Sequence, residues 1–108
     1  MKNKKKISYH LVLTIVAEGN LEKIMDIAKE SGIYGGTVLK GRELTNIIPK
    51  KILGFNIEEE KEIILNIVKD EDKNKFMKNI SKEVGIKTEK EGICFSLPID
   101  GTIGLLEE

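Results

Sequence analysis

The feature that most limits the fold of this chain is an internal repeat, because a shift of 53 residues lays the second half over the first. Residues 29–33 read Lys-Glu-Ser-Gly-Ile, and residues 82–86 read Lys-Glu-Val-Gly-Ile. Apolar positions upstream also coincide, since Ile24 falls on Met77. Two halves with the same apolar pattern predict one supersecondary unit that is used twice.

The first half has the pattern of a strand, a helix and a second strand. Residues 7–16 are dense in β-branched residues and predict a strand that is covered on both faces. Apolar residues at helical spacing predict a helix over 21–31, with Asn20 as its N-cap and Gly32 as the left-handed residue after its end. Residues 37–39 predict the second strand.

The second half repeats this order. Residues 61–68 predict a third strand, and Asp70 then caps a helix that ends at Gly85. Residues 92–98 predict a fourth strand that stops at a proline. The resulting order is βαββαβ, and right-handed crossovers in both units give the ferredoxin-like α+β fold, a four-stranded antiparallel sheet with two helices on one face.

Such a sheet leaves its other face uncovered, and strand 7–16 has little polarity on either side. Alternate side chains lie on opposite faces of a strand. One side carries Ile7, Tyr9, Leu11, Leu13 and Ile15, and the other, which is only weakly polar, carries Ser8, His10, Val12, Thr14 and Val16. We therefore expect the uncovered face to pack against further copies of the chain.

The length of 108 residues suits a single domain. We assign it to residues 7–103, with a basic tail at 1–6 and a second tail at 104–108. Region 41–54 lacks a clear period and predicts a long loop without fixed secondary structure. The 18 basic residues balance the 18 acidic ones, and this balance argues against a nucleic-acid partner, which selects for an excess of Lys and Arg.

Candidate chemical groups are few and scattered. The single cysteine, Cys94, excludes an intramolecular disulfide and fits a reducing cytoplasm, and no apolar run approaches the roughly 18 residues of a membrane span. His10 is the only histidine, and we expect a packing role for it. No nucleophile, base and orienting group come together in the sequence, so we expect neither catalytic residues nor an enzyme.

Two segments resemble parts of one family, the PII nitrogen-regulatory signal proteins. Residues 32–38 (Gly-Ile-Tyr-Gly-Gly-Thr-Val), followed by 40–42 (Lys-Gly-Arg), resemble the stretch that enters the large flexible loop of that family. Residues 92–99 (Gly-Ile-Cys-Phe-Ser-Leu-Pro-Ile) resemble its last core strand. With the tandem repeat and the long central loop, the resemblance covers about residues 7–103.

This resemblance implies a homotrimer in which the three sheets line the inside and clefts between subunits bind a nucleotide. It places ligand contacts at Gly35, Gly36, Thr37, Gly41, Arg42, Lys90 and Gly92, with Arg42 and Lys90 as the cationic candidates. It also implies that the loop docks on a target enzyme, transporter or regulator. The loop residues expected to contact that partner are Arg42, Ile47, Ile48, Pro49, Ile52 and Leu53.

The sequence departs from the family where phosphate would bind. Ile93 occupies the position of the family's lysine beside Gly92, and residues 104–106 (Gly-Leu-Leu) occupy the positions of two arginines that flank an apolar residue. We therefore expect ATP to bind weakly or not at all. The loop also lacks Tyr and Ser, so uridylylation or serine phosphorylation has no acceptor there.

Two other classes of protein share the βαββαβ order. A trimeric metal-binding protein similar to the divalent-cation tolerance family would have to use His10, Cys94 or the acidic residues within 58–62. A small-molecule-binding regulatory module of the ACT type is the third possibility. We expect no metal site, because these candidate ligands are far apart in the sequence.

Overall fold

Eight elements make up the structure, a computed structural model that describes residues 7–33, 35–43, 51–52, 55–56, 59–84 and 92–105. In chain order they are β1 (Tyr9–Ala17), α1 (Leu21–Glu30), β2 (Thr37–Glu43), β3 (Lys51–Ile52), β4 (Phe55–Asn56), β5 (Glu59–Lys69), α2 (Asp70–Val84) and β6 (Gly92–Pro98).

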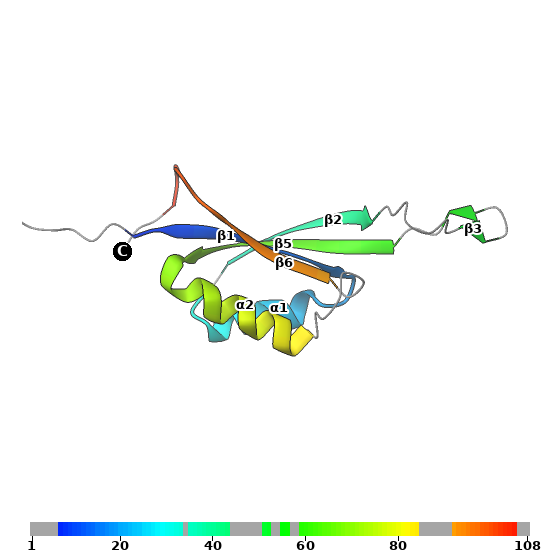
Figure 1. The fold of residues 1–108 in the computed structure, drawn as a ribbon, viewed down its shortest axis with the longest axis horizontal. Helices are drawn as coiled ribbons and strands as arrows, with labels where there is room; N and C mark the ends of the chain where they lie inside the picture. The colour runs from blue at the N-terminus through cyan, green and yellow to red at the C-terminus, as the bar shows by residue number, and fades with distance from the viewer. Residues whose placement is uncertain are drawn as a thin grey trace, which may run out of the picture.

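Four of the strands form one sheet in the order β2-β5-β1-β6, and α1 and α2 both lie on the same side of it (Figure 1). Every neighbouring pair is antiparallel. The two strands of each half are separated by one strand of the other half, so that the two repeats interlock. The predicted ferredoxin-like order is confirmed.

The core lies between the helices and the sheet. From the helices it takes Ile24, Ile27, Ala28, Phe76 and Ile80, and from the strands Val12, Val16, Ile64 and Val68. These strand residues share one face because their positions alternate along β1 and β5. Neither described helix is long and apolar enough to span a membrane.

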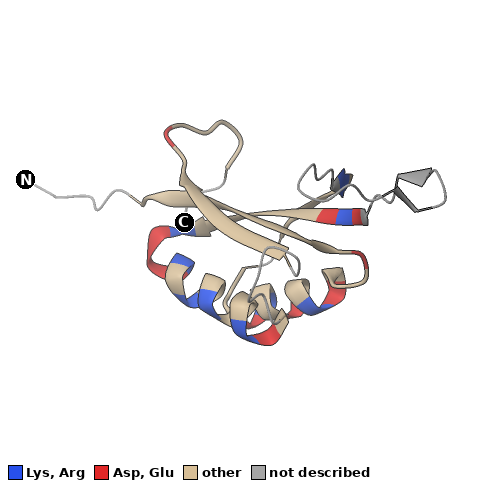
Figure 2. Ribbon diagram, turned by 45° about the vertical axis from the view of Figure 1, so that its right-hand side comes forward, with Lys and Arg blue, Asp and Glu red and all other residues tan. Residues whose placement is uncertain are grey.

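The helices cover the side of β1 that carries Val12, Thr14 and Val16, and all three side chains are fully buried. The opposite side of the sheet is apolar at its centre, and no described element of the chain covers it. Leu39, Phe95 and Leu97 on that side are 51%, 39% and 50% exposed. Figure 2 shows charged residues along the two helices and at the end of β5, whereas β1 and β6 carry none. We call this side of the sheet the bare face.

The predicted loop at 41–54 is corrected at its beginning and in its interior. Gly41 and Arg42 belong to β2, where they pair with Lys61 and Glu60 of β5. β5 begins before the predicted third strand and provides hydrogen-bonding partners for these residues. β3 lies within the loop and pairs with β4, which follows it, so part of the loop has fixed secondary structure. Residues 44–50 and 53–54 lie outside the described residues.

The predicted N-cap of α1 is wrong, whereas the predicted left-handed glycine after its end is confirmed. Asn20 precedes the helix, but its side chain caps no helical amide; Nδ2 donates instead to the Ala17 carbonyl at 3.0 Å. The carbonyl of Asn20 accepts from the Ile24 amide at 3.1 Å and begins the helix. Gly32 has the predicted left-handed conformation, with φ of +82°, directly after the C-cap Ser31. Gly85 lies outside the described residues.

We expect Phe76→Ala to lower the free energy of unfolding by about 3–5 kcal/mol, because it removes a fully buried ring from the centre of the core. Lys78→Ala on the exposed side of α2 is the control and should change it by less than about 0.5 kcal/mol. Urea unfolding at one protein concentration measures both. Equal effects of the two substitutions would contradict the core described above.

Candidate functional site

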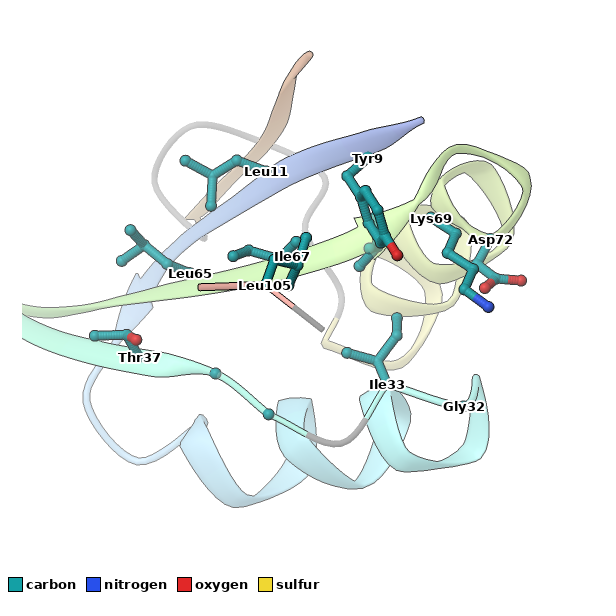
Figure 3. A pocket seen from close by; sticks show the side chains of 13 residues that line it. Tyr9, Leu11, Gly32, Ile33, Thr37, Leu65, Ile67, Lys69, Asp72 and Leu105 are labelled. Carbon is teal, nitrogen blue, oxygen red and sulfur yellow. The ribbon is translucent and has the colours of Figure 1, made fainter. Parts of the chain in front are cut away.

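A cavity of about 590 Å³ opens where the chain enters β2, and we call it the entry cavity (Figure 3). Its lining comes from five parts of the chain: β1 (Tyr9, Leu11), the connection from α1 into β2 (Gly32, Ile33, Gly35, Gly36, Thr37), β5 (Leu65, Ile67, Val68, Lys69), α2 (Asp72) and the final segment (Leu105). Its volume lies within the range of small-molecule sites.

One wall of the entry cavity is the backbone at Gly35 and Gly36, which Asn66 of β5 holds from the core side. Asn66 Nδ2 donates to the Gly35 carbonyl at 2.8 Å. A Cβ on Gly36 would lie 2.8 Å from the same nitrogen, so a side chain there would collide with the amide. Asn66 is fully buried, and its Oδ1 has no hydrogen-bond partner among the residues that the structure describes.

Asn66 is the residue that the sequence analysis missed. It is the only polar residue in the run Ile63 to Val68. A single amide side chain in a buried strand needs hydrogen-bond partners, so its presence in this apolar run predicts a buried hydrogen bond. The sequence alone could not supply the partner, because Gly35 is 31 positions away.

A second cavity, of about 240 Å³, lies at the other end of β2, and we call it the exit cavity. It is lined by Ile15, Gly41, Arg42, Lys61, Ile63, Gly92 and Ile93. Lys61 is only 3% exposed, and Arg42 Nε lies 3.8 Å from Glu60 Oε1. The exit cavity thus combines two cationic residues with two glycines that allow close approach to the backbone.

The residues predicted to bind a ligand fall into these two groups within one chain. Gly35, Gly36 and Thr37 line the entry cavity. Gly41, Arg42 and Gly92 line the exit cavity. Lys90 lies outside the described residues.

Of the loop residues predicted to contact a partner, Arg42 belongs to β2 and Ile52 to β3. The remaining four, Ile47, Ile48, Pro49 and Leu53, lie outside the described residues.

The other candidate groups have local structural contacts. His10 Nδ1 lies 3.3 Å from Asp70 Oδ1, next to the point where the Asp70 amide donates to the Ser8 carbonyl. Thr14 Oγ1 and Cys94 Sγ are 3.6 Å apart in a hydrogen bond. Burial raises the pKa of the Cys94 thiol, and the hydrogen bond with Thr14 lowers it by less. A raised pKa favours the unreactive protonated thiol.

The acidic residues within 58–62 do not form a cluster in the described part of the chain. Glu60 faces Arg42, whereas Glu62 accepts a hydrogen bond from the Gly19 amide at 3.0 Å. Among the described residues, no three His, Cys, Asp or Glu side chains are grouped so as to hold a metal ion.

The fold is similar to a solved structure, that of Arabidopsis thaliana PII bound to citrate. The two chains are 20% identical, the match covers 85% of this chain and 78% of that one, and the TM-score is 0.67. No family model matches the sequence, and no curated protein sequence matches it significantly. The comparison therefore establishes a PII-like fold.

We expect Gly36→Ala to lower the free energy of unfolding by about 1–3 kcal/mol, because the new Cβ meets Asn66 Nδ2. Gly35→Ala is the matched control, since no atom lies within 4 Å of a Cβ there; it should cost less than about 0.5 kcal/mol. Urea unfolding compares the two.

The same pair of substitutions tests whether Asn66 is responsible. In an Asn66→Ala background, Gly36→Ala should cost less than it does in the native chain, because the colliding amide is gone. An unchanged cost in that background would contradict the role given to Asn66.

Proposed function

We propose that this protein is a homotrimeric, PII-like regulatory protein of the cytoplasm that acts by binding rather than by catalysis. The bare face carries this proposal, because it is a broad apolar surface with a cavity at each end of β2. The PII-like fold supports the same assignment. On the basis of the family resemblance, we also propose that the protein takes part in the regulation of nitrogen metabolism.

The bare face needs a partner of similar chemistry. In register across the sheet, Leu13 lies between Leu65 and Phe95. The residues two positions away on the same face are also apolar: Leu11, Ile15, Ile63, Ile67, Ile93 and Leu97. Contiguous apolar surface of this extent marks an interaction site. Further copies of the chain offer the same surface, and closed symmetry satisfies each copy equally.

Assembly also unites the two halves of the ligand site. The entry and exit cavities lie at opposite ends of β2, so one chain cannot bring both to one small ligand. In the proposed trimer the entry cavity of one subunit faces the exit cavity of the next. Gly35, Gly36, Thr37 and Gly92 then supply backbone contacts, and Arg42 and Lys90 supply positive charge, with Gly41 allowing close approach.

The segment between β2 and β5 is the proposed contact with a target enzyme, transporter or regulator. Its apolar residues Ile47, Ile48, Ile52 and Leu53 and its Pro49 suit a surface that is buried on docking. The ligand in the cleft would control this docking.

The oligomeric state is the first test of the proposal. Light scattering should give about 36 kDa, three times the chain mass of 12.1 kDa. Phe95→Glu should give monomers, because it places a charge on the bare face without changing the core of a single chain. Asn74→Glu on the exposed side of α2 is the control and should remain trimeric. A native chain that scatters as a monomer would overturn the proposal.

The second test concerns ATP. Charge-assisted contacts contribute about 1.5–3 kcal/mol each, so the absence of three family cations should weaken ATP binding by several orders of magnitude. Calorimetry with and without magnesium and 2-oxoglutarate should therefore show weak binding or none. A micromolar dissociation constant would contradict this expectation, and Arg42→Ala and Lys90→Ala would then identify the replacing cations.

A further inference from the structure

We propose that the entry cavity binds a zwitterion with an apolar body, namely an α-amino acid with a large apolar side chain. The inference gives a ligand class to the regulatory site, and in that sense it rests on the proposed function. The binding groups themselves all come from one chain. One end of the cavity has one positively and one negatively charged side chain, and the rest of its lining is apolar.

The polar end is formed by Tyr9, Lys69 and Asp72, which lie together at one side of the cavity (Figure 3). Tyr9 and Lys69 are directly opposite each other in the β1–β5 register, and Asp72 follows in the first turn of α2. All three are partly buried. Within the described residues, none of these side chains forms a hydrogen bond or an ion pair.

The charges at this end disfavour a ligand that carries only negative or only positive charge. Lys69 attracts an anion, but Asp70, Glu71 and Asp72 together make the beginning of α2 acidic. Of these three residues only Asp72 lines the cavity, where a polyphosphate would meet one carboxylate for one ammonium group, and a simple cation would meet Lys69. A zwitterion places its carboxylate on Lys69 and its ammonium group on Asp72, so both charges of the site are satisfied.

The rest of the cavity is suited to an apolar side chain. Its apolar lining consists of Leu11, Ile33, Leu65, Ile67, Val68 and Leu105. About 590 Å³ accommodates an amino acid of this kind together with water.

Three probes of similar shape separate the contributions of the two charges. L-leucine carries both charges, 4-methylpentanoate carries only the carboxylate, and 3-methylbutylamine carries only the ammonium group. Calorimetry on the full chain should show L-leucine binding about ten- to a hundredfold more tightly than either analogue, since each analogue lacks one charge-assisted contact. Equal affinity for all three probes, or no heat with L-leucine at millimolar concentration, would overturn the inference.

Two substitutions then assign each charge to a residue. Lys69→Met and Asp72→Asn should each weaken L-leucine binding about ten- to a hundredfold. For 4-methylpentanoate the two variants should act in opposite directions, because Asp72→Asn removes a repulsive carboxylate whereas Lys69→Met removes the attractive charge. Lys75→Met and Asp26→Asn, which lie on exposed helix positions, are the controls and should leave all three affinities unchanged. Weakening of 4-methylpentanoate by Asp72→Asn would overturn the assignment.

Light scattering of the same samples distinguishes this inference from the proposed function. A trimer that does not bind L-leucine overturns the ligand class alone. A monomer that binds L-leucine overturns the trimer and supports the entry cavity as a site within one chain. Urea unfolding of Lys69→Met and Asp72→Asn checks that the variants are folded, and Tyr9→Phe, which removes only a hydroxyl group, provides a milder third variant.

Discussion

The pairing of β1 with β5 is the interaction on which the rest of this structure depends. It joins the two halves of the chain at the centre of the sheet, over a register that runs from Tyr9 opposite Lys69 to Ala17 opposite Lys61. One side of this pair carries the core beneath the helices, and the other side carries the middle of the bare face. Its two ends also position the cavities, since Tyr9 and Lys69 line the entry cavity and Lys61 lines the exit cavity.

The repeat predicted the βαββαβ order because the spacing of apolar residues indicates which side of each helix and strand faces the core. Both helices and all four strands of the main sheet lie close to their predicted positions. The errors occur where a distant partner decides the structure. β2 continues to Glu43 because β5 extends alongside it, and no local pattern in residues 41–43 signals that partner. The exception is Asn20, whose side chain bonds Ala17, three positions earlier, rather than the helix, although its residue type favours a cap.

The candidate site could be predicted only in part, for a related reason. Glycines beside Thr37 and Arg42 are visible as local motifs, and they do line cavities. Asn66 and Lys69 carry no motif, because their importance comes from contacts with Gly35 and Tyr9, which are 31 and 60 positions away. Strand register therefore had to be known before the polar end of the entry cavity could be recognised.

The interlocking of the repeats has a consequence for the order in which the protein is made. β1 has only two neighbours in the sheet, β5 and β6, and both come from the second half of the chain. On the ribosome, the first half therefore emerges with its most apolar strand unpaired, and it cannot complete a sheet until residues 59–98 have followed it. Neither repeat is a folding unit by itself, despite their likeness in sequence. Sheets whose paired strands are far apart in the sequence form slowly. The protein is therefore most prone to aggregate while only its first half has been synthesised.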